Sequence, residues 1–183
     1  MRQFIDLIET FQQDVLYHGT SVYAAAAILV SNVLEAGDHD DGPHGVSLTR
    51  EPKVARTFGR AVDYRDADNA FTNAGQGFYT KTETQGVVMA FDGTLLKRDH
   101  RIVNHAWDGD ESESEERVVG KGFEVSKYLL SFTVSDDDLE EWHNFLTAEA
   151  EVYAQANDER EAKLALGRRD MLSILKNHPK RAR

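Results

Sequence analysis

Residues 16–21 read Leu-Tyr-His-Gly-Thr-Ser and place an imidazole, two hydroxyls and a glycine within one short segment. The apolar residues that lead into it predict a short strand, and Thr20 or Ser21 is suited to cap a helix over residues 22–30. Gly19 permits a close approach of the backbone to a ligand or another element. A corner between a strand and a helix N-terminus also offers backbone N–H groups and a dipole that favours negative charge. The segment therefore predicts a binding site for a negatively charged ligand.

Two later segments carry further polar groups. Residues 45–49, Gly-Val-Ser-Leu-Thr, alternate like a strand, which places Ser47 and Thr49 on one face. Pro52 follows this segment and is suited to the first turn of a helix, which predicts a helix over residues 52–59. Residues 111–116, Glu-Ser-Glu-Ser-Glu-Glu, collect carboxylates just before Arg-Val-Val, which predicts a further strand. An imidazole, two hydroxyls and a carboxylate thus follow one another on successive predicted strands.

The motifs Tyr-His-Gly-Thr, Gly-Val-Ser-Leu-Thr-Arg, Val-Val-Met-Ala-Phe-Asp-Gly and Glu-Glu-Arg-Val-Val-Gly appear in this order between residues 15 and 134. Together they make the chain similar to the ADP-ribosyltransferase superfamily, in the form found among bacterial and phage effectors. The resemblance implies an α+β fold with a mixed, split β-sheet of about six strands and flanking helices. It also implies an enzyme that uses NAD as co-substrate and transfers ADP-ribose to a macromolecule, with a protein as the favoured acceptor, while releasing nicotinamide.

The resemblance further implies that NAD is held by His18, Gly19, Thr20, Ser47 and Thr49. His18 matches the position that holds the adenosine-side ribose, and Gly19 matches the backbone position that bonds the nicotinamide carboxamide. Ser47 and Thr49 match the motif that supports the nicotinamide-ribose pocket and positions the catalytic glutamate.

The catalytic glutamate is expected at Glu116 or, failing that, Glu115. Breaking the bond to nicotinamide generates an oxocarbenium-like sugar, and a carboxylate near the developing charge stabilises mainly the transition state. Strand alternation places Glu116 and Val118 on one face and Glu115 on the other, so one of the two glutamates points into the site. We predict Glu116, because a strand follows it as in the family.

Aromatic residues in the middle of the chain are candidates to stack on nicotinamide, among them Phe58 and Tyr64. Packing in the core is the alternative role for each of them. The acidic loops 38–42 and 108–111 lack the 12-residue ligand spacing of a calcium loop. We therefore expect no metal cofactor.

The formal net charge of −11 and the lack of cysteine restrict the function further. Cysteine nucleophiles, disulfides and cysteine-based zinc sites are excluded. The negative charge disfavours nucleic acid as a partner, although Arg50, Arg56 and Arg60 leave a nucleic-acid acceptor open. A non-catalytic acidic protein that binds and inhibits a basic partner is the alternative from another class. The basic segment 168–183 fits a solvated helix end or a contact with an acidic partner.

One domain over residues 1–183 is expected, with an N-terminal helix and catalytic core in 1–134 and a helical extension in 135–183. The extension begins at a capping serine, Ser135, and its second helix is expected to break or bend near Gly167. No apolar run reaches the length of a membrane span, and no signal peptide is recognisable, so we expect a cytoplasmic protein without membrane contact.

Overall fold

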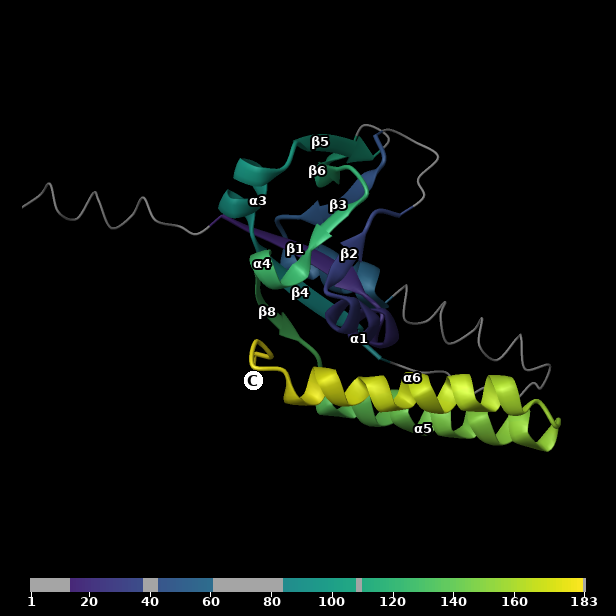
Figure 1. The fold of residues 1–183 in the computed structure, drawn as a ribbon. Coiled ribbons are helices and arrows are strands. Elements are labelled where there is room, and N and C mark those ends of the chain that lie inside the picture. The colour runs from purple at the N-terminus through teal and green to yellow at the C-terminus, as the bar shows by residue number, and fades with distance from the viewer. Residues whose placement is uncertain (1–13, 38–42, 61–83, 108–109, 183) are drawn as a thin grey trace, which may run out of the picture.

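A computed structural model describes residues 14–37, 43–60, 84–107 and 110–182 of the chain (Figure 1). Its main sheet has six strands in the order β5-β6-β3-β1-β4-β8, and every neighbouring pair is antiparallel. The strands are β1 (Val15–Thr20), β3 (Gly45–Thr49), β4 (Val87–Asp92), β5 (Ile102–Trp107), β6 (Asp110–Val119) and β8 (Leu129–Thr133). The predicted α+β class with about six strands is confirmed. The helix predicted near the N-terminus and Tyr64 lie outside the described residues.

A second, two-stranded sheet and several helices surround the main sheet. Its strands are β2 (Val33–Glu35) and β7 (Gly122–Glu124), and the helices are α1 (Val22–Ser31), α3 (Gly93–Asp99), α4 (Val125–Tyr128), α5 (Asp136–Gln155) and α6 (Glu159–Asn177). Residues 52–60 are helical as well. Figure 1 shows α5 and α6 as a long hairpin at the β8 end of the sheet, with α1 beside α6.

One face of the main sheet forms the core together with α1 and the small sheet. Leu16 of β1 lies opposite Phe91 of β4, and both side chains are fully buried. Phe91 meets Phe123 of β7 edge to face, with the ring centroids 5.3 Å apart. This arrangement is favourable for two aromatic rings, and it fixes the small sheet against the large one.

Short polar side chains determine where the helices begin. The Ser21 hydroxyl accepts a hydrogen bond from the Ala24 N–H at 3.0 Å and starts α1, and Ser135 does the same for α5. Both caps agree with the sequence pattern. Asp92 caps α3 by accepting from the Leu95 N–H at 2.9 Å, although the sequence suggested only the end of a strand there. The predicted break near Gly167 is wrong, because α6 continues through it.

The basic C-terminal tail folds back onto the edge strand β8. The Phe132 N–H donates to the Lys180 carbonyl at 3.1 Å, and the Ala182 N–H donates to the Phe132 carbonyl at 2.9 Å. Arg181 also pairs with Asp136 at 3.0 Å. The tail therefore covers one edge of the sheet instead of ending as a solvated helix terminus. In the described part of the chain, no helix combines the length and apolar character that crossing a membrane requires.

The helical residues 52–60 pack directly on β1 at Gly19. A Cβ atom built on Gly19 would overlap the Ala55 carbonyl oxygen and would lie 2.8 Å from the Gly59 amide nitrogen. Only a residue without a side chain leaves room for this backbone contact. Close packing of a helix on a strand is therefore a sufficient reason for glycine at this position.

The variant Gly19→Ala is expected to lower the free energy of unfolding by about 3 kcal/mol, because the new methyl group meets backbone atoms that cannot rotate away. Gly167→Ala is the matched control, since a Cβ there meets nothing within 4 Å. The control should gain up to about 1 kcal/mol from helix propensity. Urea denaturation of both variants measures the difference, and equal stabilities would refute the packing argument.

Glu149 of α5 is a buried carboxylate, with 3% of its surface exposed. Its Oε2 atom has no hydrogen-bond partner among the described residues. Burial raises the pKa of Glu149 above its ordinary value, and the positive charge of Arg168 opposes this only in part. The folded protein therefore binds the Glu149 proton more tightly than the unfolded chain does, and ionisation of Glu149 destabilises the fold.

Glu149→Gln is expected to raise the free energy of unfolding at pH 7 by about 1 kcal/mol. The free energy of unfolding of the wild type should fall by this amount as the pH rises from the ordinary glutamate pKa of 4.5 through the raised pKa of Glu149. The free energy of unfolding of the variant should not fall in this way. Below that range the two proteins should be equally stable. Thermal unfolding between pH 4 and pH 8 tests this, with exposed Glu151→Gln as the control; parallel curves for wild type and Glu149→Gln would contradict it.

Candidate functional site

Three adjacent strands bring the candidate residues together from distant parts of the chain. Strand β3 lies between β1 and β6, so the motifs around residues 18, 47–49 and 115–116 meet on neighbouring strands. Register then decides which of their side chains share a face, because directly opposite residues of an antiparallel pair lie on the same side.

The register between β3 and β6 separates the two glutamates. Thr49 lies opposite Glu115, and Leu48 lies opposite Glu116. Ser47, two residues before Thr49, lies opposite Arg117. Glu115 therefore shares a face with both hydroxyl residues, while Glu116 lies on the opposite face with the buried Leu48.

Glu115 is held by its neighbour on the same face, Arg117. The Arg117 Nε and Nη2 atoms donate to the two carboxylate oxygens of Glu115 at 3.0 and 3.1 Å. Such a two-pronged contact fixes the plane of the carboxylate as well as its position. The Glu115 side chain is 11% exposed and is therefore largely buried.

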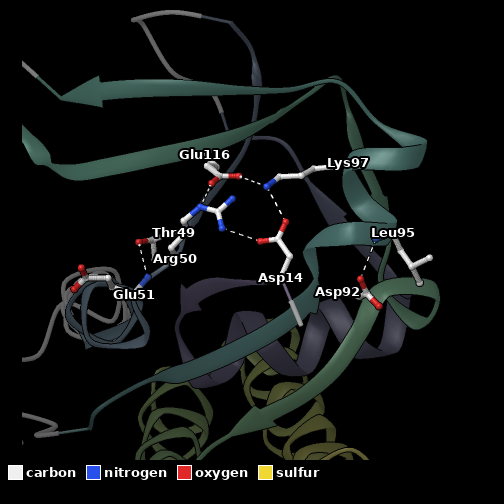
Figure 2. A network of polar contacts seen from close by, with 8 residues as sticks. All are labelled: Asp14, Thr49, Arg50, Glu51, Asp92, Leu95, Lys97 and Glu116. Carbon is white, nitrogen blue, oxygen red and sulfur yellow. Dashed lines mark hydrogen bonds and ion pairs between the residues drawn. The ribbon is translucent and has the colours of Figure 1, made fainter. Parts of the chain in front are cut away.

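Glu116 belongs to a different set of charges, which Figure 2 shows. Its carboxylate pairs with Arg50, just after β3, and lies 3.6 Å from the Lys97 ammonium of α3. Asp14 pairs with the same two cations at 2.8 Å each. The hydrogen bond from Lys97 lowers the pKa of Asp14 against the effect of partial burial, and Arg50 adds to this. Two acids and two bases thus tie β6, α3 and the ends of β1 and β3 together.

His18 lies where the pairing between β1 and β3 stops. Tyr17 and Thr49 form one matched pair, and the described residues show no further pair between these two strands. The His18 Nδ1 atom lies 3.0 Å from the Ser47 carbonyl oxygen, so the imidazole bridges the two strands. A carbonyl only accepts hydrogen bonds, so Nδ1 carries the proton and Nε2 keeps a lone pair. Burial lowers the pKa of His18, and the Ser47 carbonyl opposes this only in part.

The helical residues 52–60 lie on the same face as Ser47, Thr49 and Glu115. Gly19, whose missing side chain would point at this helix, alternates with His18 and therefore shares the face of Tyr17 and Thr49. Phe58 is 49% exposed, which is unusual for a large apolar side chain. An exposed aromatic ring therefore extends from the helix that covers the hydroxyl and carboxylate face.

Two of the other candidates have evident structural roles. The Thr49 hydroxyl accepts a hydrogen bond from the Glu51 N–H at 3.2 Å, as Figure 2 shows, and this precedes the helix start. Thr20 is buried at the end of β1, opposite Val87. Arg117 was not among the predicted site residues. Its place on the same face as Glu115 was available from strand alternation, but its position opposite Ser47 and its burial were not.

Among the described residues, no group of three His, Cys, Asp or Glu side chains has an arrangement that could hold a metal ion. Comparisons with protein-family models, with curated proteins and with solved structures gave no match. The function is therefore argued from the motifs and from the geometry of the three strands.

The imidazole geometry predicts the Nδ1–H tautomer for His18 and a titration midpoint below the ordinary value of 6.5. Nitrogen-15 NMR of the histidine rings measures both. Because folding lowers this pKa, the contribution of His18 to stability is present above pH 6.5 and is lost as the pH falls through the lowered value. An Nε2–H tautomer in the neutral ring would be inconsistent with the bridge to Ser47.

Proposed function

We propose that the chain is an NAD-dependent ADP-ribosyltransferase with Glu115 as its catalytic carboxylate and a macromolecule, preferably a protein, as acceptor. The single observation that carries this proposal is the register between β3 and β6, which sets Thr49 opposite Glu115. Strand β3 also neighbours β1, which bears His18. A histidine, paired hydroxyls and a glutamate on three neighbouring strands are what the resemblance implies for this activity.

The chemistry requires a negative charge close to the ribose. When the bond to nicotinamide breaks, its electron pair leaves with nicotinamide and positive charge develops on the sugar. A carboxylate fixed beside the ribose stabilises this charge in the transition state more than in the ground state. The acceptor then forms the new bond to the same carbon and loses its proton.

The choice of Glu115 over Glu116 follows from their surroundings. Glu115 lies on the face that carries Ser47 and Thr49. Glu116 is 6% exposed on the other face and is already engaged by Arg50 and Lys97. A carboxylate that balances two structural cations is poorly placed to respond to a developing charge elsewhere.

The other candidates fit supporting roles. Strand alternation places His18 on the face opposite to Ser47, Thr49 and Glu115, so neutral His18, with its lone pair on Nε2, is suited to accept a hydrogen bond from a ribose hydroxyl only where that hydroxyl lies at the gap between β1 and β3. Phe58 offers an exposed ring for stacking on nicotinamide. Gly19 is covered by the helical residues 52–60, so its proposed contact to nicotinamide would use the backbone only.

Glu115→Gln is expected to reduce nicotinamide release from NAD by at least about 100-fold, because the amide keeps the shape of the carboxylate and removes its charge. Glu116→Gln should retain nicotinamide release within a few-fold of wild type and should instead lower the melting temperature. Release of labelled nicotinamide, normalised to folded protein, measures both, and label transfer in a cell lysate identifies the acceptor class.

If Glu116→Gln released no nicotinamide and Glu115→Gln kept full activity, Glu116 and not Glu115 would be the catalytic carboxylate. No release by the wild type, together with no thermal stabilisation by NAD, would reject the enzyme and favour an acidic binding protein.

A further inference from the structure

Arg117 has the largest side chain among the fully buried residues of the described chain, with 1% of its surface exposed. A guanidinium keeps its charge at any physiological pH, and burying it costs several kcal/mol unless it is well paired. The surroundings of Arg117 must therefore be arranged around its charge. It lies on the face of β6 that carries Glu115 and is opposite Ser47.

The Arg117 side chain is fixed at several points. Its Nε and Nη2 atoms bind the two oxygens of Glu115, and its Nη1 atom donates to the Pro43 carbonyl at 3.3 Å. A Cβ built on Gly45 would lie 2.9 Å from the Arg117 Cγ atom. The absence of a side chain at Gly45 thus leaves room for the arginine stem, and the carbonyl anchors the far side of the guanidinium.

We propose that Arg117 is a positioning residue for catalysis, which holds the Glu115 carboxylate ionised and in one orientation on the face shared with Ser47 and Thr49. This proposal rests on the proposed transferase function. The two hydrogen bonds from the Arg117 guanidinium determine the direction of both Glu115 carboxylate oxygens. A carboxylate oxygen can accept more than one hydrogen bond. Arg117 thereby orients Glu115 without touching the substrate itself.

A purely structural ion pair is the competing explanation for the same contacts. A buried pair often contributes little net stability compared with apolar residues of similar volume. The two explanations differ in what they predict for turnover. A structural pair affects the amount of folded protein, whereas a positioning residue affects the rate of each folded molecule and the pH at which the carboxylate is active.

The test uses full-length Arg117→Gln and Arg117→Lys, with NAD as the substrate and nicotinamide release as the readout. Arg181→Gln is the matched control, because Arg181 also donates to a carboxylate, Asp136, and to a carbonyl, Val134, each at 3.0 Å. This control removes contacts from the C-terminal tail to Val134, just after β8, and to the first residue of α5, away from β6. Circular dichroism and melting temperature give the folded fraction used for normalisation.

Arg117→Gln is expected to lower kcat about 100-fold with little change in KM for NAD, since orientation is lost and binding is kept. The acid side of its kcat pH profile should move to higher pH, because the neighbouring positive charge is gone. Arg117→Lys keeps the charge but lacks the planar fork, so it should keep the wild-type pH profile and lose kcat. Arg181→Gln should match the wild type in kcat and in the pH profile of kcat.

Folded Arg117 variants with the wild-type kcat and pH profile would overturn the positioning role while leaving the transferase intact. If Arg117→Gln fails to fold, Arg117→Lys decides the question: a reduced kcat at unchanged KM supports the role, and a wild-type kcat overturns it. A wild-type protein that releases no nicotinamide overturns both proposals, so the two failures are distinguishable.

Discussion

The candidate site depends on the register between β3 and β6. Side chains alternate along a strand, so a slip of one residue would exchange the faces of every residue on β6. With the observed register, Glu115 lies with Ser47 and Thr49, and Glu116 lies with Leu48. This alignment thus determines which of the two adjacent glutamates lies with the hydroxyl residues.

Charged contacts on both faces of β6 hold that alignment. On one face, Arg117 binds Glu115 and reaches the Pro43 carbonyl, just before β3. On the other face, Glu116 pairs with Arg50, just after β3. A slipped register would separate Glu116 from Arg50 and Arg117 from the Pro43 carbonyl, while the Arg117–Glu115 pair, which lies within β6, would remain. Arg117 of β6 therefore binds the chain just before β3, and Arg50, just after β3, binds Glu116 of β6.

The sequence pattern predicted the elements whose signals are local. Strand β3 was recognised from alternation, and the starts of α1 and α5 were recognised from capping serines. The small sheet was missed, because three-residue strands such as β2 and β7 are too short to show a period. The extent of α6 was misjudged since an exposed helix tolerates one glycine at a cost of about 1 kcal/mol.

The grouping of the candidate residues on neighbouring strands followed from the resemblance, whereas their faces and burial depend on tertiary contacts. Placing His18, Ser47, Thr49 and the two glutamates near one another needed only the order of the motifs. Choosing between the glutamates needed the register, which the strand sequence leaves open because both Glu115 and Glu116 precede the same apolar residues. The burial of Arg117 depends on the space above Gly45, far away in the chain.

The end of pairing between β1 and β3 explains why a histidine at this point is useful. Where two strands separate, their facing backbone groups need other partners, since unsatisfied polar groups are costly inside a protein. The His18 imidazole satisfies the Ser47 carbonyl from across the gap. In doing so it fixes its own tautomer and turns its acceptor nitrogen away from β3. The same hydrogen bond therefore satisfies the backbone where the two strands separate and leaves Nε2 as the acceptor atom that the proposed ribose contact would use.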